Sequence, residues 1–113
     1  MPMIKVETSV SLNDEKRNIL KSELGKAITV MGKSENYLMI NLSDSQDLYL
    51  GGNKLEKGAY VEIKVLGDVD SKKSNLMTNN VCEILEKELQ IPSDKVYVSY
   101  FGTQNWGWNK SNF

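Results

Sequence analysis

Hydrophobic residues recur along this chain with two different periods, and each period predicts one kind of element. Four short stretches rich in β-branched and aromatic residues, mostly with a period of two, are predicted as strands: Ile4–Val10, Tyr37–Leu42, Ala59–Leu66 and Val96–Phe101. Two longer stretches repeat their apolar residues at steps of three and four, as one face of a helix does, and they end near Met31 and Leu89. The chain therefore reads as strand, helix, strand, repeated once.

Residues with capping preferences lie at the ends of the two predicted helices. Ser11 and Asp14 have the spacing of a capping box before the first helix, and Ser71 or Ser74 is expected to cap the second. Gly32 is placed to end the first helix in the left-handed conformation. These signals set the expected limits of both helices.

The two halves of the chain have the same order of elements, at an offset of roughly 55–60 residues. Each half is long enough for one βαβ unit, whose strands pair in parallel through a right-handed crossover. We therefore predict an α/β (α+β) fold, in which two pseudo-symmetric βαβ units form a four-stranded sheet with both helices on one face. The other face would be uncovered, and its Tyr and Val residues would need burial, which favours self-association of sheet faces. A short extra strand is expected at Leu48–Leu50.

Length and composition fit a single domain that spans residues 1–113. The net charge of −1 gives no general attraction to nucleic acid or to an anionic membrane. No apolar run approaches the ~18 residues that span a bilayer, and nothing at the start resembles a signal peptide. The single cysteine, Cys82, excludes an intrachain disulfide and a Cys-x-x-Cys site, and we expect it to be a small buried hydrophobe.

The chain has no histidine, which removes the usual proton carrier at neutral pH, the His-based triads and the commonest zinc ligand. Acid–base chemistry would then need a carboxylate, a lysine, a tyrosine or the N-terminal amine. Pro2 becomes the N-terminus once Met1 is removed, and the strand that follows would hold this secondary amine at the end of a sheet. A free α-amine has a pKa near ~8, and burial lowers that pKa toward the range of a general base. The alternative is that Met-Pro is a common start without chemistry.

Six short motifs occur in order along the whole chain: Met1-Pro2-Met3, Gly32-Lys33 before Tyr37, Gly51-Gly52, Val65-Leu66-Gly67, Val96–Tyr100 and Gly107–Phe113. In this order they resemble the macrophage migration inhibitory factor family of the tautomerase superfamily. The resemblance implies a homotrimer, in which edge strands extend a neighbour's sheet and the active sites lie between subunits. It also implies keto–enol tautomerase activity on small aromatic α-keto acids such as phenylpyruvate, and on dopachrome-like substrates, with no cofactor and no metal.

The same resemblance assigns roles to individual residues around Pro2, the implied catalytic base. Lys33 would contact the substrate carboxylate or the developing enolate, although by sequence alone it also fits a solvated cation near a helix end. Leu66 would offer its backbone N–H, and Tyr97 and Ser99 would come from a neighbouring subunit. The other implied pocket residues are apolar or aromatic: Met3, Tyr37, Trp106, Trp108 and Phe113.

Four positions carry further expectations about this pocket. Tyr37 fits either the core or the pocket rim. Ser99 is shorter than the asparagine common in the family, and Trp106 stands where a smaller aliphatic residue is common, which predicts a narrower and more aromatic mouth. Lys64 shares a strand face with Leu66 and is a second candidate cation near the mouth.

The resemblance also leaves a second function open. The chain would then be a secreted cytokine-like protein that binds a CD74-like cell-surface receptor and keeps only vestigial catalysis. Family members occur in the cytoplasm and leave cells without a signal peptide, so both locations are expected. Thiol oxidoreductase activity is not expected, because the region after Gly51-Gly52 contains no Cys-x-x-Cys.

Overall fold

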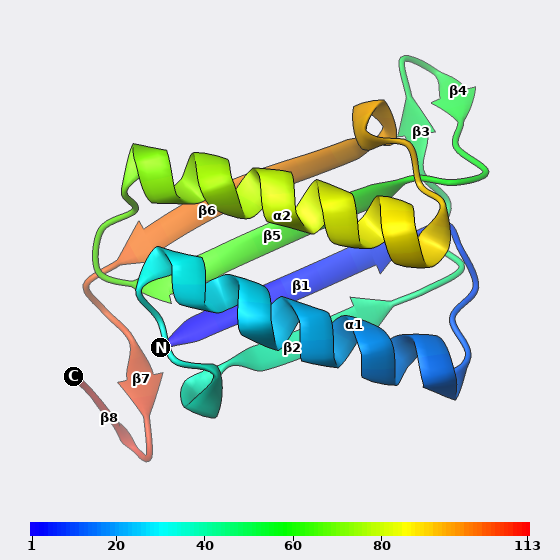
Figure 1. The fold of residues 1–113 in the computed structure, drawn as a ribbon. Coiled ribbons are helices and arrows are strands. Elements are labelled where there is room, and N and C mark those ends of the chain that lie inside the picture. Colours follow the sequence, from blue (N-terminus) through cyan, green and yellow to red (C-terminus); the bar gives the residue numbers. More distant parts are fainter.

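A four-stranded mixed sheet lies beneath two helices in the computed structural model, which describes residues 1–113 (Figure 1). The strand order is β2-β1-β5-β6, and the strands span Met39–Ser43, Pro2–Thr8, Ala59–Leu66 and Val96–Thr103. β1 pairs in parallel with β2 and β5 with β6, whereas the two inner strands pair antiparallel. α1 (Asp14–Ala27) and α2 (Ser71–Leu89) run in opposite directions over one face. The predicted pair of βαβ units in one sheet is therefore confirmed.

Short elements lie at the ends of this sheet. β3 (Tyr49–Leu50) pairs with β4 (Asn53–Lys54), and β7 (Gly107–Trp108) pairs with β8 (Ser111–Asn112). Single turns of 3-10 helix occupy three further segments: Ile28–Met31, Glu35–Tyr37 and Ser93–Lys95. Neither α-helix combines the length and the apolar content that a membrane span requires.

The cap of α1 differs from the predicted one. Asn13, and not Ser11, caps the helix, because its Oδ1 accepts from the backbone N–H of Lys16 at 2.8 Å. Ser11 lies outside the helix because the next residue, Leu12, is buried and its N–H donates to the Asp44 carboxylate at 2.8 Å. The burial of Leu12 therefore moves the helix start by two residues.

The cap of α2 also differs. Asp70 caps it through an N–H of Lys73 at 2.8 Å, so the expectation for Ser71 or Ser74 is wrong. A carboxylate at this position accepts the hydrogen bond and also interacts favourably with the helix dipole. Gly32 does end the first helical segment with φ +73°, as predicted.

Several strand ends are shifted from their predicted positions. β1 ends at Thr8, because the side chain of Thr8 turns inward and donates to the Gly58 carbonyl at 2.7 Å. Tyr37 lies in a 3-10 turn that Ser34 caps, so β2 begins after it. β6 continues to Thr103 because its last residues still pair with the end of β5.

The hydrophobic core lies between the sheet and the two helices, and it consists of 17 buried residues. On the inner strands, Ile4, Val6, Val61 and Ile63 have no exposed surface. Each such side chain stabilises the fold by roughly 1.5–3 kcal/mol through burial. Because β1 is an inner strand with a fully buried face, the start of the chain is held at a fixed place at one end of the sheet.

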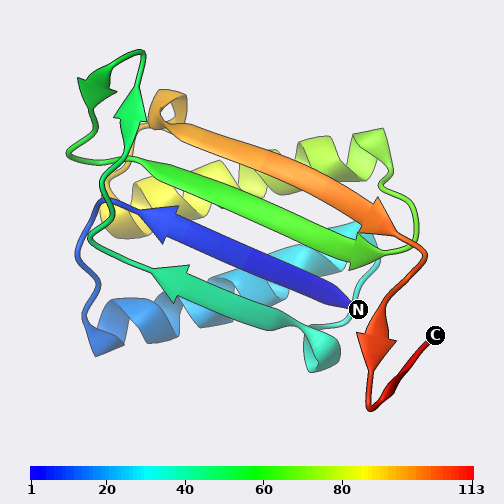
Figure 2. The same ribbon diagram turned by 180° about the vertical axis from the view of Figure 1, so that it is seen from behind.

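The face of the sheet away from the helices, called the open face below, is covered by neither helix (Figure 2) and carries two ion pairs. Lys5 pairs with Glu7 at 3.1 Å, and Lys64 pairs with Glu62 at 3.2 Å. The expectation that valines need burial on this face is wrong, because the strand period of two turns the valines of the main strands toward the helices. Tyr97 does lie exposed on the open face, at 63% of its surface.

Candidate active site

The start of β1 places the N-terminus between two strands. Pro2 is buried and lies opposite Val65 of β5, and the carbonyl of Met1 accepts a hydrogen bond from the N–H of Leu66 at 2.9 Å. The Pro2 nitrogen is here part of the peptide bond to Met1, so it has no free lone pair and the free amine belongs to Met1. Burial, followed by the charge of Lys33, holds the pKa of the Met1 amine below its usual value.

Lys33 reaches the same corner of the molecule from the other side. The left-handed backbone of Gly32 turns the chain after the helical segment, and the Lys33 ammonium donates to the Leu66 carbonyl at 2.8 Å. Both backbone groups of Leu66 are therefore engaged, with Met1 on the N–H side and Lys33 on the carbonyl side. The structure thus brings Pro2, Lys33 and Leu66 together at one end of the sheet.

A pocket of about 810 Å³ opens beside this corner. Its wall is formed by the start of β1, the segment around the second 3-10 turn, one residue of β5 and the start of the C-terminal hairpin. The lining residues are Met1, Pro2, Met3, Asn36, Tyr37, Leu38, Met39, Ile40, Lys64, Asn105, Trp106, Gly107 and Trp108. A largely apolar and aromatic wall with one cation suits a flat, partly charged organic molecule.

The predicted pocket residues fall into two groups. Met3, Tyr37, Trp106 and Trp108 line the pocket directly. Phe113 is one layer further out: its ring stacks on Trp108 with centroids 6.2 Å apart, and its N–H donates to the Trp106 carbonyl. The aromatic tail therefore forms one side of the pocket.

Sequence reasoning missed several lining residues on the β2 side. Met39 lies opposite Met3 in the parallel register of β1 and β2, and it is 68% exposed. Asn36 and Leu38 flank the predicted Tyr37. Met39 can be recognised as a lining residue only from the register of β1 and β2, which places this large exposed side chain beside Met3. The sequence alone does not reveal that register.

Comparison with known proteins identifies the family of this chain. A family profile described as Macrophage migration inhibitory factor (MIF) matches residues 1–113. The chain belongs to this family. Macrophage migration inhibitory factor of Xenopus laevis is 29% identical to it over 116 residues, which cover 100% of this chain and 99% of the relative.

Solved structures of MIF proteins agree with this assignment over the full length. MIF2 of Leishmania major is 33% identical, with a TM-score of 0.92 and coverage of 100% of this chain and 97% of that one. The MIF homologue of Prochlorococcus marinus is 30% identical, with a TM-score of 0.84 and coverage of 98% of both chains. The fold is therefore that of the MIF family and the tautomerase superfamily.

Two residues that the family resemblance assigned to the site lie far from Pro2 within one chain. Tyr97 pairs with Tyr60 of β5, five residues before the partner of Pro2, which is a distance of roughly 17 Å along the strand. The Ser99 hydroxyl forms a hydrogen bond with the Tyr60 hydroxyl, and the two oxygens are 2.6 Å apart. Neither side chain lines the pocket beside Pro2.

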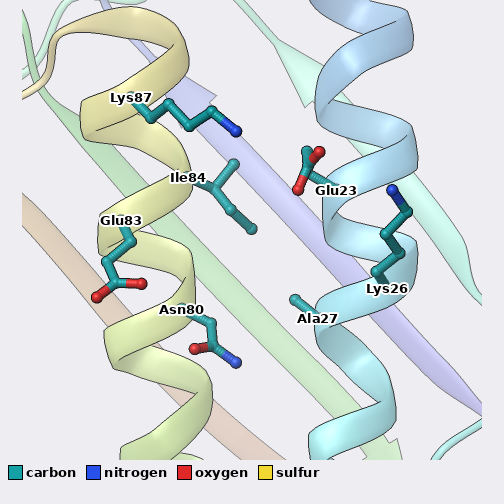
Figure 3. A pocket seen from close by; sticks show the side chains of 7 residues that line it. All are labelled: Glu23, Lys26, Ala27, Asn80, Glu83, Ile84 and Lys87. Atoms are coloured by element: carbon teal, nitrogen blue, oxygen red, sulfur yellow. The ribbon is translucent and has the colours of Figure 1, made fainter.

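A second hollow, of about 370 Å³, lies on the outer side of the molecule between α1 and α2 (Figure 3). Glu23 and Lys87 point toward each other from the two helices, and the apolar side chains of Ala27 and Ile84 also face the groove. Charges of both signs alternate along this groove. It contains none of the residues predicted for the MIF site.

Cys82 is partly buried beside the core. Burial, and then the charge of Glu86, raise the pKa of its thiol, so the reactive thiolate is disfavoured. This agrees with its expected role as a small hydrophobe.

Proposed function

We propose that this MIF-family chain is a keto–enol tautomerase in which the amine of Pro2, freed by removal of Met1, is the general base. One observation carries the proposal. Pro2 begins an inner strand at the wall of an aromatic pocket, beside a lysine ammonium that lies 2.8 Å from the Leu66 carbonyl. The freed Pro2 nitrogen would then be a secondary amine next to a positive charge, which lowers the pKa of such an amine toward the range that a general base requires.

Removal of Met1 has two effects at the same place. It breaks the Met1–Pro2 peptide bond and leaves Pro2 with a secondary amine. It also removes the carbonyl that accepts the Leu66 N–H at 2.9 Å. The Met1 carbonyl oxygen therefore stands where a substrate oxygen would be bound, and the freed N–H becomes a donor to it.

The reaction then needs two proton movements. The neutral Pro2 nitrogen takes a proton from the carbon next to the substrate carbonyl, and the electrons of that C–H bond form the C=C bond of an enolate. Lys33 and the Leu66 N–H stabilise the negative charge on the enolate oxygen. Protonation of this oxygen gives the enol, and loss of the proton from Pro2 restores the base.

The wall of the pocket supports an aromatic α-keto acid as substrate. Tyr37, Trp106 and Trp108 offer flat apolar surfaces to an aromatic ring. Phenylpyruvate and dopachrome have this shape. In the proposed homotrimer, Tyr97 of a neighbouring copy would complete the pocket, because within one chain it lies too far from Pro2.

A cytokine-like role through a CD74-like receptor, and a cytoplasmic or secreted location, stay predictions of the family resemblance. Such binding is compatible with catalysis, since neither α1 nor α2 contributes a lining residue to the pocket.

The experiment measures enolisation of phenylpyruvate by the unmodified chain and by Pro2→Gly, after intact mass has shown that Met1 is absent. Glycine keeps a terminal amine but lacks the rigid ring and secondary nitrogen. We expect kcat/KM to fall by about 100-fold or more in Pro2→Gly. Equal activity of the two proteins contradicts the proposed base, and a sedimentation mass of one subunit contradicts the shared site.

A further inference from the structure

Lys64 has the one cationic side chain among the residues that line the candidate pocket. In the antiparallel register of β1 and β5 it lies opposite Met3, the residue after Pro2. Its side chain also borders a neighbouring hollow of about 250 Å³, together with Phe101 and Trp106. It is 52% exposed, so its ammonium is accessible from the pocket mouth.

The Lys64 ammonium has two partners, a carboxylate and an aromatic ring, and both interactions are weak. Its Nζ lies 3.2 Å from Glu62 Oε1 and 5.9 Å from the centre of the Phe101 ring. The other Glu62 oxygen accepts from the Tyr60 hydroxyl at 3.0 Å, and Lys5 lies opposite Glu62 on β1. If Lys64 turns away, the Glu62 carboxylate therefore keeps a hydrogen-bond donor and a neighbouring cation. Half-exposed ion pairs of this kind are weak, so the exchange of partners costs little.

We propose that Lys64 is a specificity residue that binds the carboxylate of an anionic substrate in this pocket. The inference rests on the proposed tautomerase function and deepens it by naming the substrate class: aromatic keto acids in preference to their neutral esters. The Lys64 ammonium leaves Glu62 and pairs with the substrate carboxylate. Lys33 stays at the Leu66 carbonyl, next to the oxygen that becomes the enolate. The two lysines thus serve two different negative charges.

The test compares phenylpyruvate with its methyl ester, which differ by one negative charge. Lys64→Met removes the ammonium, and Lys64→Arg keeps a positive charge. Lys54→Met is the control, because Lys54 is an exposed cation in an ion pair with Asp47 at 3.7 Å and lies outside the pocket. We expect the ratio of kcat/KM for acid over ester to fall about fivefold in Lys64→Met, mainly through KM, and to persist in the other two variants.

Binding gives a second readout that needs no turnover. The only tryptophans of the chain, Trp106 and Trp108, both line the pocket, so their fluorescence reports on ligands bound there. Lys64→Met should raise the Kd of phenylpyruvate about fivefold and leave the Kd of the ester unchanged. Glu62→Gln should strengthen the preference for the acid, because it releases the ammonium.

The outcomes separate this inference from the tautomerase proposal. An unchanged acid-to-ester ratio in Lys64→Met, or an equal loss in Lys54→Met, overturns the role of Lys64. A weaker acid preference in Glu62→Gln overturns the exchange of partners. If the protein shows no turnover but binds phenylpyruvate in preference to its methyl ester only when Lys64 is present, the role of Lys64 is supported and the tautomerase proposal is contradicted.

Discussion

Replacing Lys33 by methionine tests the electrostatics of the proposed site. Methionine keeps the length and the apolar stem of the side chain but removes the ammonium that donates to the Leu66 carbonyl at 2.8 Å. It also removes one of the two causes that hold the pKa of the terminal amine below its usual value, burial being the larger. We expect the positive charge of Lys33 to act in the same direction on the Pro2 amine after Met1 is removed.

The expected loss of activity follows from the environment of Lys33. Removing a donor from an enclosed oxyanion site slows catalysis by about 10²- to 10³-fold. Lys33 is only partly buried and already shares its ammonium with a carbonyl oxygen, so we expect a smaller loss, about 10- to 100-fold in kcat/KM at the pH optimum. The lost hydrogen bond should lower the free energy of unfolding by about 1 kcal/mol.

The pH profile gives a separate signature with a defined sign. The base acts as the neutral amine, and a nearby positive charge disfavours the ammonium form and lowers its pKa. Without Lys33 this pKa rises, so the acid limb of the profile of kcat/KM moves to higher pH. The shift is measured with phenylpyruvate at low ionic strength, where screening is weakest.

Lys26→Met is the control, because it makes the same change of charge in the groove between the helices (Figure 3). An acid limb that stays in place in Lys33→Met, or moves to lower pH, refutes the assignment of Lys33. An equal shift in Lys26→Met would show that only net charge matters.

Two further predictions concern the frame around the site. A Cβ at Gly102 would collide with the backbone carbonyl oxygen of Gly67, so Gly102→Ala should lower the free energy of unfolding by about 2–3 kcal/mol in urea titrations; an unchanged midpoint contradicts this close packing. The backbone N–H of Leu12, and then the Arg17 guanidinium, hold the pKa of the Asp44 carboxyl below its ordinary value of 3.8. This contribution to stability is present above that value and is lost as the pH falls through the lowered pKa. Asp44→Asn should therefore be less stable than the parent at pH 7, and the difference should shrink as the pH falls below 3.8; a difference that does not change with pH contradicts the linkage.

Local patterns predicted the main elements well because those elements are amphipathic. The alternation in Ala59–Leu66 is followed residue by residue in the structure, with Val61, Ile63 and Val65 buried and Lys64 exposed. The caps were predicted less well, since Ser11 fits a capping box locally and only the burial of Leu12 displaces it.

The hairpin formed by β7 and β8 had no sequence signal that would have revealed it. Its turn places Asn109 and Lys110 at φ 52° and 77°. Both values are positive, as in the turns that usually contain Asn-Gly. Here Lys110 stands where such a turn usually has glycine, so the sequence does not show the Asn-Gly pattern. The hairpin matters for the site because Trp108 and Phe113 lie on it.

The site itself depends on contacts between distant segments, which periodicity does not encode. Lys33 and Leu66 are 33 residues apart in sequence, and their contact required the register of β1 on β5. The family resemblance assigned each of these two residues to the site in advance. Lys64 was suggested by strand alternation, and the pocket wall shows which residues it joins there.

The contacts of Met1 give its removal a larger role than that of exposing a base. With Met1 in place, the proline nitrogen is an amide and the Leu66 N–H is occupied. In the proposed site, its departure would create the base, free the donor and enlarge the pocket that Met1 helps to line. All three changes occur at one end of β1, which the buried face of that strand holds in place. Since a protein that keeps Met1 would have the same fold and core, loss of activity in such a protein says nothing about Lys33 or Lys64, and the state of the N-terminus must be established before any variant of this site is interpreted.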